Sequence, residues 1–200
     1  ITAKLTDGTV NNASINLTAK AFNKNFSGMD IELESLVGSF VIDDTTLKLL
    51  PSVNPISNID ATVTFNKQNI DFSIQSGRLK KLNIENGKIN IRNIGNNEHV
   101  SIDLIANGPV SETIKYAAQS DLKLFDQIGL LPEINAGNHK THLNLNFPLN
   151  EKITFQEVQW KMLTDIQDFE SSNFIQNNDI RKGNFQVRLS NKEITAEGIA

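Results

Sequence analysis

The chain has 200 residues, of which 38% are hydrophobic, and a formal net charge of −4. So weak a charge excludes a strongly basic surface for nucleic acid and an acidic tail. The absence of cysteine excludes a disulfide framework and a cysteine-based metal site. No apolar run approaches the roughly 18–20 residues that span a membrane as a helix.

The ends of the sequence suggest a piece of something longer. It begins at Ile1 with no methionine and no secretion signal, and it ends at Ala200 just after a strand-like pattern. We therefore expect residues 1–200 to form one repetitive β segment of a longer protein. Any signal or anchor would then lie outside them.

Alternation of apolar and polar residues dominates the chain. A period of two predicts strands with one apolar face and one wet face. In chain order, the apolar positions of these runs are Ala61, Val63 and Phe65; Ile70, Phe72 and Ile74; Val100, Ile102 and Leu104; Leu143, Leu145 and Phe147; and Val187 and Leu189.

Residues that tolerate a positive φ angle separate these runs and predict turns. The connections are short, which predicts neighbouring strands that pair antiparallel as meanders. The predicted turns are Asp7-Gly8, 66–68, Ser76-Gly77, Asn86-Gly87, 95–97 and 190–192.

A weak internal repeat is visible. Residues 61–72 align with 185–196, and residues 40–49 have a similar hairpin outline. Repeats of this size predict a solenoid, a propeller or an extended sheet. The alternative is a set of ordinary hairpins that look alike because all hairpins follow the same rules.

One segment departs from the β pattern. Residues 111–129 carry apolar side chains at helical spacing, with Ser111 placed to cap the start and Glu112 in the first turn. This predicts a helical insert, either one bent helix or two short helices. The polar stretch from Thr164 to Asp179 lacks a period and predicts a loop.

The apolar strand faces have to be covered, because burying one large apolar side chain is worth about 1.5–3 kcal/mol. One short helical insert is too small to cover a sheet of this size. The sheet therefore either folds onto itself as a sandwich or barrel, or curls into a groove whose floor holds apolar ligands.

No catalytic or metal-binding motif emerges. The spacing of His139 and His142 places them on opposite faces of a strand, and with His99 they are expected to be solvated surface histidines. The sequence has no nucleophile elbow, phosphate loop or zinc-protease motif. We expect no enzyme activity, no metal and no cofactor.

The order of features from Ser57 to Asn150 is distinctive. Alternating strands at 58–65, 70–79 and 100–107 lead to Gly108-Pro109, a helical insert, another strand and Pro148-Leu149. This order resembles the YhdP branch of the AsmA-like envelope proteins. The chain departs from that pattern in lacking a proline inside the helical segment.

The resemblance implies an all-β fold with one short helical insert: an elongated, curved antiparallel sheet of repeated hairpins that forms a groove. It implies a non-enzymatic, periplasmic segment of a protein anchored in the inner membrane of a Gram-negative bacterium. It also implies a role in phospholipid transport between the inner and outer membranes.

In that interpretation, apolar strand positions line the groove and contact phospholipid acyl chains. The protein meets the membrane through an anchor outside this segment, and it does not bind nucleic acid. The competing hypothesis is a structural or adhesive β-sandwich domain of a surface protein. The expected groove residues are Val63, Phe65, Ile70, Phe72, Ile74, Ile102, Leu104, Leu143, Leu145 and Phe147.

Overall fold

The computed structural model describes residues 4–23, 29–48, 54–119, 133–149, 157–175 and 178–199. Within these ranges, eleven strands form one antiparallel sheet, accompanied by helix α1. The strands are β1 (Lys4–Thr6), β2 (Thr9–Asn23), β3 (Met29–Lys48), β4 (Ile56–Asn66), β5 (Ile70–Leu79), β6 (Leu82–Arg92), β7 (His99–Pro109), β8 (Glu133–Pro148), β9 (Gln159–Ile175), β10 (Asn178–Ser190) and β11 (Ile194–Ile199).

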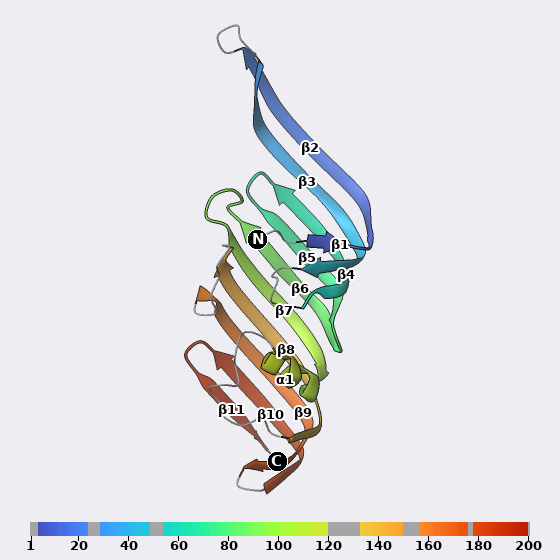
Figure 1. Cartoon of the computed structure of the whole chain (residues 1–200), viewed down its shortest axis with the longest axis vertical. Coiled ribbons are helices and arrows are strands. Elements are labelled where there is room, and N and C mark those ends of the chain that lie inside the picture. The colour runs from blue at the N-terminus through green and yellow to red at the C-terminus, as the bar shows by residue number, and fades with distance from the viewer. Residues whose placement is uncertain are drawn as a thin grey trace.

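The sheet is long, curved and open (Figure 1). From β3 to β11 each strand pairs with the next in the chain, and β1 and β2 both pair with β3. No second sheet packs on it among the described residues. The predicted curved antiparallel sheet is therefore confirmed, and the sandwich alternative is wrong.

Two predicted turns are wrong, because Ser76-Gly77 and Asn86-Gly87 lie inside β5 and β6. The chain instead reverses at Lys80-Lys81, where Lys80 takes a φ of 57°. The two glycines serve the sheet interior, where large side chains from adjacent strands need space. Leu104 pairs with Gly87, and an added Cβ there would lie 2.2 Å from the Leu104 Cδ2 atom.

Two further predictions fail because the strands continue through polar residues. Residues 40–49 were expected to form a hairpin, but β3 runs straight through to Lys48. The expected loop from Thr164 to Asp179 falls mostly within β9 and β10; residues 176–177 lie outside the described ranges. Bulges explain both errors. One extra residue moves the apolar side chains from odd to even positions in the sequence, or the reverse, so the alternation looks interrupted although the strand continues.

A line of bulges crosses β2 to β6, and we call it the bulge row: Asn12, Asp44, Asn58 and Glu85. The pairing register shifts beside each of them, and the first three have φ angles of 50–52°. Side chains link neighbouring strands here. Asn58 donates to Asp44 at 2.5 Å, and Asp60 accepts from the Asp44 backbone at 3.0 Å.

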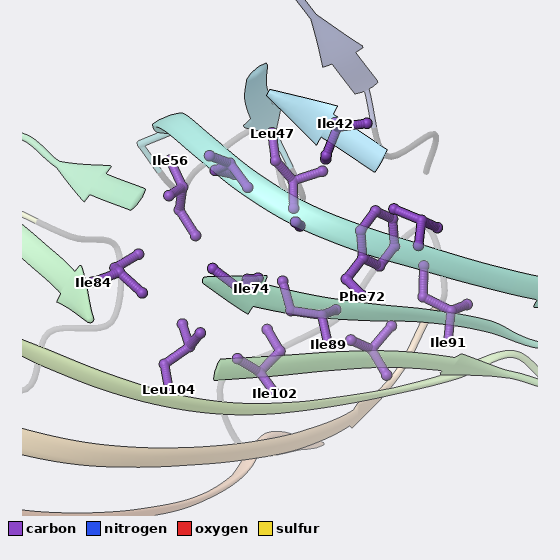
Figure 2. Close-up of a cluster of buried hydrophobic side chains, with 14 of the residues drawn as sticks. Ile42, Leu47, Ile56, Phe72, Ile74, Ile84, Ile89, Ile91, Ile102 and Leu104 are labelled. Atoms are coloured by element: carbon purple, nitrogen blue, oxygen red, sulfur yellow. The ribbon is translucent and has the colours of Figure 1, made fainter. Parts of the chain in front are cut away.

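Beyond the bulge row, the ends of β3 and β4 fold over the apolar face. Thr45, Leu47 and Ile56 are buried there. Ile56 of β4 and Ile84 of β6 both reach over Gly77 of β5, within 3.3–3.5 Å of where its Cβ would be. Figure 2 shows Leu47 and Ile56 on one side of this cluster and Ile84 on the other. The sheet thus covers part of its own apolar face.

The aligned segments 61–72 and 185–196 both form hairpins, and their turns are built alike. The Asn66 side chain accepts hydrogen bonds from the backbone amides of Gln68 and Asn69. The Ser190 side chain accepts in the same way from Lys192 and Glu193. In each turn a backbone hydrogen bond of 2.9 Å joins the first residue to the fourth.

Helix α1 spans Val110–Gln119, within one residue of the predicted start. It follows Pro109, the last residue of β7, and its first turn contains Glu112. Ser111 therefore lies inside the helix rather than at its cap. The remainder of the predicted insert, residues 120–129, lies outside the described residues.

Candidate apolar groove

The strand registers align apolar side chains in rows that run across the sheet. The central row crosses ten strands, and each neighbour in it is a direct cross-strand partner. From β2 to β11 it contains Val10, Ile42, Ala61, Ile74, Gly87, Leu104, Leu143, Met162, Leu189 and Ile194.

Two further rows lie on the same face, one beyond the other on one side of the central row. One contains Phe40, Val63, Phe72, Ile89, Ile102, Leu145 and Trp160. The other contains Ile15, Gly38, Phe65, Ile70, Ile91, Val100 and Phe147. The three rows together form a continuous apolar stripe, which we call the inner face.

All ten residues expected to line the groove lie in these three rows. Six of them are buried, with at most 8% of their surface exposed: Val63, Phe72, Ile74, Ile102, Leu104 and Phe147. The other four, Phe65, Ile70, Leu143 and Leu145, are half-buried. The structure brings the set together, but in the middle of the sheet these side chains contact one another.

The sequence reasoning missed the contribution of β6. Ile89 and Ile91 connect the β5 and β7 parts of the rows, and Ile84 closes the core near Gly77. Their signal was present as the alternation Ile89-Asn90-Ile91. It was overlooked because Asn86-Gly87 resembled a turn. Ile42 of β3 was missed because residues 40–49 had a hairpin outline.

The inner face becomes accessible towards both ends of the sheet. Val10, Ile15, Leu17 and Ile31 of β2 and β3 are 62–71% exposed, and Ile194 of β11 is 60% exposed. Leu17 and Ile31 lie on the same face as Ile15, as their pairing with Leu36 and Ala21 shows. Apolar surface is therefore concentrated at the two edges of the stripe.

The opposite, outer face is polar. Burial alone raises the pKa of Asp71, but hydrogen bonds from Arg92 and Asn90 outweigh it, so the pKa lies below its usual value. Lys140 pairs with Glu85 at 2.6 Å. A sheet with one apolar and one charged face can hold apolar ligands on only one side.

Comparison with known protein families matches the whole chain, residues 1–200, to the family described as YhdP protein. The chain belongs to the YhdP family. The resemblance drawn from the order of strands, Gly-Pro and helix is thus confirmed. Neither the curated protein sequences nor the solved structures compared with this chain gave a match.

In this YhdP-family chain, one part of the inner face is polar and lies beneath α1. His139 of β8 is buried, and its Nε2 atom lies 2.5 Å from the hydroxyl of Thr113 in α1. Its Nδ1 atom lies 2.8 Å from Thr141, which in turn lies 3.0 Å from Thr164 of β9. Burial lowers the pKa of His139. The expectation of a solvated surface histidine is therefore wrong here.

His142 does lie on the other face, as its spacing from His139 predicts. It is about half exposed, and its Nε2 atom is 2.8 Å from an oxygen of Asp103. Among the described residues of this YhdP-family chain, no three His, Cys, Asp or Glu side chains are placed to hold a metal ion. No helix in the described ranges is long and apolar enough to span a membrane.

Proposed function

We propose that this chain is a non-enzymatic part of a lipid-transport protein, and that phospholipid acyl chains lie on its inner face. The observation that carries this proposal is the central row, which stays apolar across ten strands and reaches both edges of the sheet. Membership of the YhdP family supports the same function and a place in the bacterial envelope, between the inner and outer membranes.

The chemistry of the stripe suits acyl chains better than a compact ligand. Ile, Leu, Val and Phe side chains supply apolar contact but no fixed polar partners, so they select for apolar character rather than for a particular group of atoms. The polar outer face and the open side of the groove leave water available to phospholipid head groups.

The exposed edges are the sites where we expect acyl chains to touch the protein first. Burying one exposed Ile or Leu side chain is worth about 1.5–3 kcal/mol. Ile15, Leu17 and Ile31 are more than 60% exposed. The buried middle contributes only where bound lipid separates side chains that otherwise contact each other.

Photo-crosslinking tests this proposal with a matched pair of positions on β3. A photoreactive residue replaces Ile31 on the inner face, and in a second variant it replaces Val37. Both side chains are apolar and more than half exposed, but Val37 pairs with Asn16 and Asn66 on the outer face.

With the protein purified from bacterial membranes, we expect crosslinked phospholipid at position 31 and little at position 37. Mass spectrometry of the adducts identifies the lipid. Equal labelling at the two positions, or no lipid at either, would contradict the proposal.

A further inference from the structure

Helix α1 occupies the inner face at β8. Val110 is buried, and its Cγ2 atom lies 3.4 Å from the position of a Cβ at Gly137. Thr113, one turn further on, contacts His139. At the rim, Glu112 pairs with Lys81 of the β5–β6 turn at 3.1 Å. In Figure 1 the helix lies over the sheet near β8.

One more row crosses the sheet between His139 and the central row. This side row contains Gly77, Ile84, Ala106, Thr141, Thr164, Val187 and Ala196. It is small or apolar at both ends and polar in the middle, at Thr141 and Thr164. An acyl chain that follows the side row becomes adjacent to α1 at Thr141, because Thr141 contacts His139 and His139 contacts Thr113 of α1.

The contacts that hold α1 are of a kind that water can replace. Hydroxyl and imidazole groups exchange protein partners for water with little net change in free energy, whereas apolar packing has no such substitute. The Lys81–Glu112 pair is also exposed on its lysine side, and exposed ion pairs contribute little. Val110 supplies the buried apolar contact among the side chains described here.

No described charged group stabilises a protonated His139. Its ring nitrogens lie within hydrogen-bond distance of the Thr113 and Thr141 hydroxyls, and its strand partners are Gly108 and Ile166. Several charged groups on the neighbouring elements have other partners: Glu112 pairs with Lys81 and Lys115, Lys140 with Glu85, His142 with Asp103, and Asp165 with Gln186. The pKa of His139 responds to burial and to no charge on Glu133, Lys161, Asp168 or Glu170.

We propose that α1 is a reversible stopper on the inner face, which closes the side row to acyl chains and is released by lipid or by protonation of His139. The proposal rests on the proposed lipid function. While α1 covers His139, burial disfavours protonation of the imidazole ring. Once α1 is released, the ring is in water and binds a proton more readily. Release therefore takes up a proton, and acid favours it by at most about tenfold per pH unit.

A distance measurement between two spin labels tests the stopper. The chain has no cysteine, so labels attach only at introduced sites, here Lys115→Cys on the exposed side of α1 and Lys192→Cys in the exposed β10–β11 turn. At pH 7.5 we expect one distance. At pH 5.5, or with vesicles of phosphatidylethanolamine and phosphatidylglycerol, we expect a second distance to appear.

Three variants in this labelled background assign the effect. His139→Gln keeps a side chain that can bond both hydroxyls but does not titrate, so the response to pH should disappear. Thr113→Val removes the contact from α1 and should raise the released fraction at both pH values. Thr64→Val changes an exposed outer-face threonine and should leave the distances unchanged.

Lipid extracted from the same samples separates the two proposals. Bound lipid with an unchanged distance overturns the stopper and leaves the proposed function standing. A pH response that persists in His139→Gln overturns the role of His139. An absence of lipid in every sample counts against the proposed function. If acid still releases α1 in those samples and His139→Gln abolishes that release, the Thr113–His139 contact is supported as the pH-dependent link between α1 and β8.

Discussion

The middle of the sheet and its N-terminal arm share one sequence pattern but differ in burial. By arm we mean residues 15–23 of β2 and 29–36 of β3; from residue 17 onwards β2 pairs only with this part of β3, which has no other partner among the described strands. Ile89 in the middle has no exposed surface, whereas Ile15 and Ile31 in the arm are more than 60% exposed. Alternation alone therefore does not make a core.

The difference comes from the number of neighbouring strands and from the bulge row. In the middle, each apolar side chain has a cross-strand partner on both sides, and the ends of β3 and β4 fold over the rows. The arm is a two-stranded ribbon, which is marginal in isolation. The middle of the sheet therefore contributes most of the free energy of unfolding, whereas the arm exposes apolar side chains to solvent.

Truncation of a matched pair of isoleucines should give the largest contrast. We expect Ile89→Ala to lower the free energy of unfolding by about 2–5 kcal/mol, because it leaves a cavity in a packed core. Ile15→Ala should change it by less than about 0.5 kcal/mol. Urea unfolding measures both, and similar losses would show that the arm is packed in solution.

A methyl group at Gly87 should cost somewhat less. Its Cβ would lie 2.2 Å from Leu104 Cδ2 and 2.6 Å from the Asp103 carbonyl oxygen, so we expect Gly87→Ala to destabilise by about 1–3 kcal/mol. Gly77→Ala is the control, since its nearest neighbour would be 3.3 Å away. Thermal unfolding compares the two, and an equal effect would remove the steric explanation.

Asp60 tests the bulge row. Its pKa lies below the usual value because it accepts hydrogen bonds from the Asp44 backbone and the Ser76 side chain. A lowered pKa means that the carboxylate stabilises the fold above the unfolded-state pKa, and that this contribution is lost as pH falls through the folded-state pKa. Asp60→Asn should therefore cost about 1 kcal/mol at neutral pH.

In strong acid the difference between Asp60→Asn and the parent chain should vanish, because both side chains are then neutral. Asp30→Asn, at an exposed position of the arm, is the control and should cost little at either pH. Urea midpoints over a pH series give the comparison. A cost at Asp60 that does not change with pH would assign it to packing rather than charge.

The smallest effect on stability is expected in the arm, where the effect on lipid should be large. Leu17→Glu should change the free energy of unfolding by less than about 0.5 kcal/mol, because Leu17 is 62% exposed. It should nevertheless abolish lipid crosslinking at position 31. Thr18→Glu, the next residue on the outer face, should leave crosslinking intact, and equal losses would point to a general charge effect.

The local part of the fold was predictable because alternation is a local property. The strands through Val63, Phe72, Ile102 and Leu145 and their common face follow from it directly. The positions that failed depend on distant partners. Gly87 resembles a turn residue in the sequence, and only its pairing with Leu104 shows that it belongs to a strand. Thr164 resembles a loop residue because it is polar, and only its pairing with Thr141 places it on the inner face.

Burial of the candidate groove was not predictable either. Nothing local to Leu47 or Ile56 indicates that their strands fold over the inner face, since that depends on bulges aligned across several strands. His139 is likewise buried beneath a helix whose contact residue, Thr113, is 26 residues away. Pairwise contacts across long separations are not encoded in the period of a single strand.

The bulge row also bears on which changes in length this chain can tolerate. A strand alternates strictly between two faces, so the loss or gain of one residue turns every later side chain over. Ile56 and Ile59 are three residues apart, so the bulge at Asn58 is what keeps both on the apolar face. A regular strand that retained Asn58 would turn Ile56 to water, whereas deletion of Asn58 would leave the two isoleucines on the same face without a bulge. We therefore expect relatives of this chain to differ in length at turns such as Lys80-Lys81, and to change by single residues within strands only where a bulge is lost or gained with them.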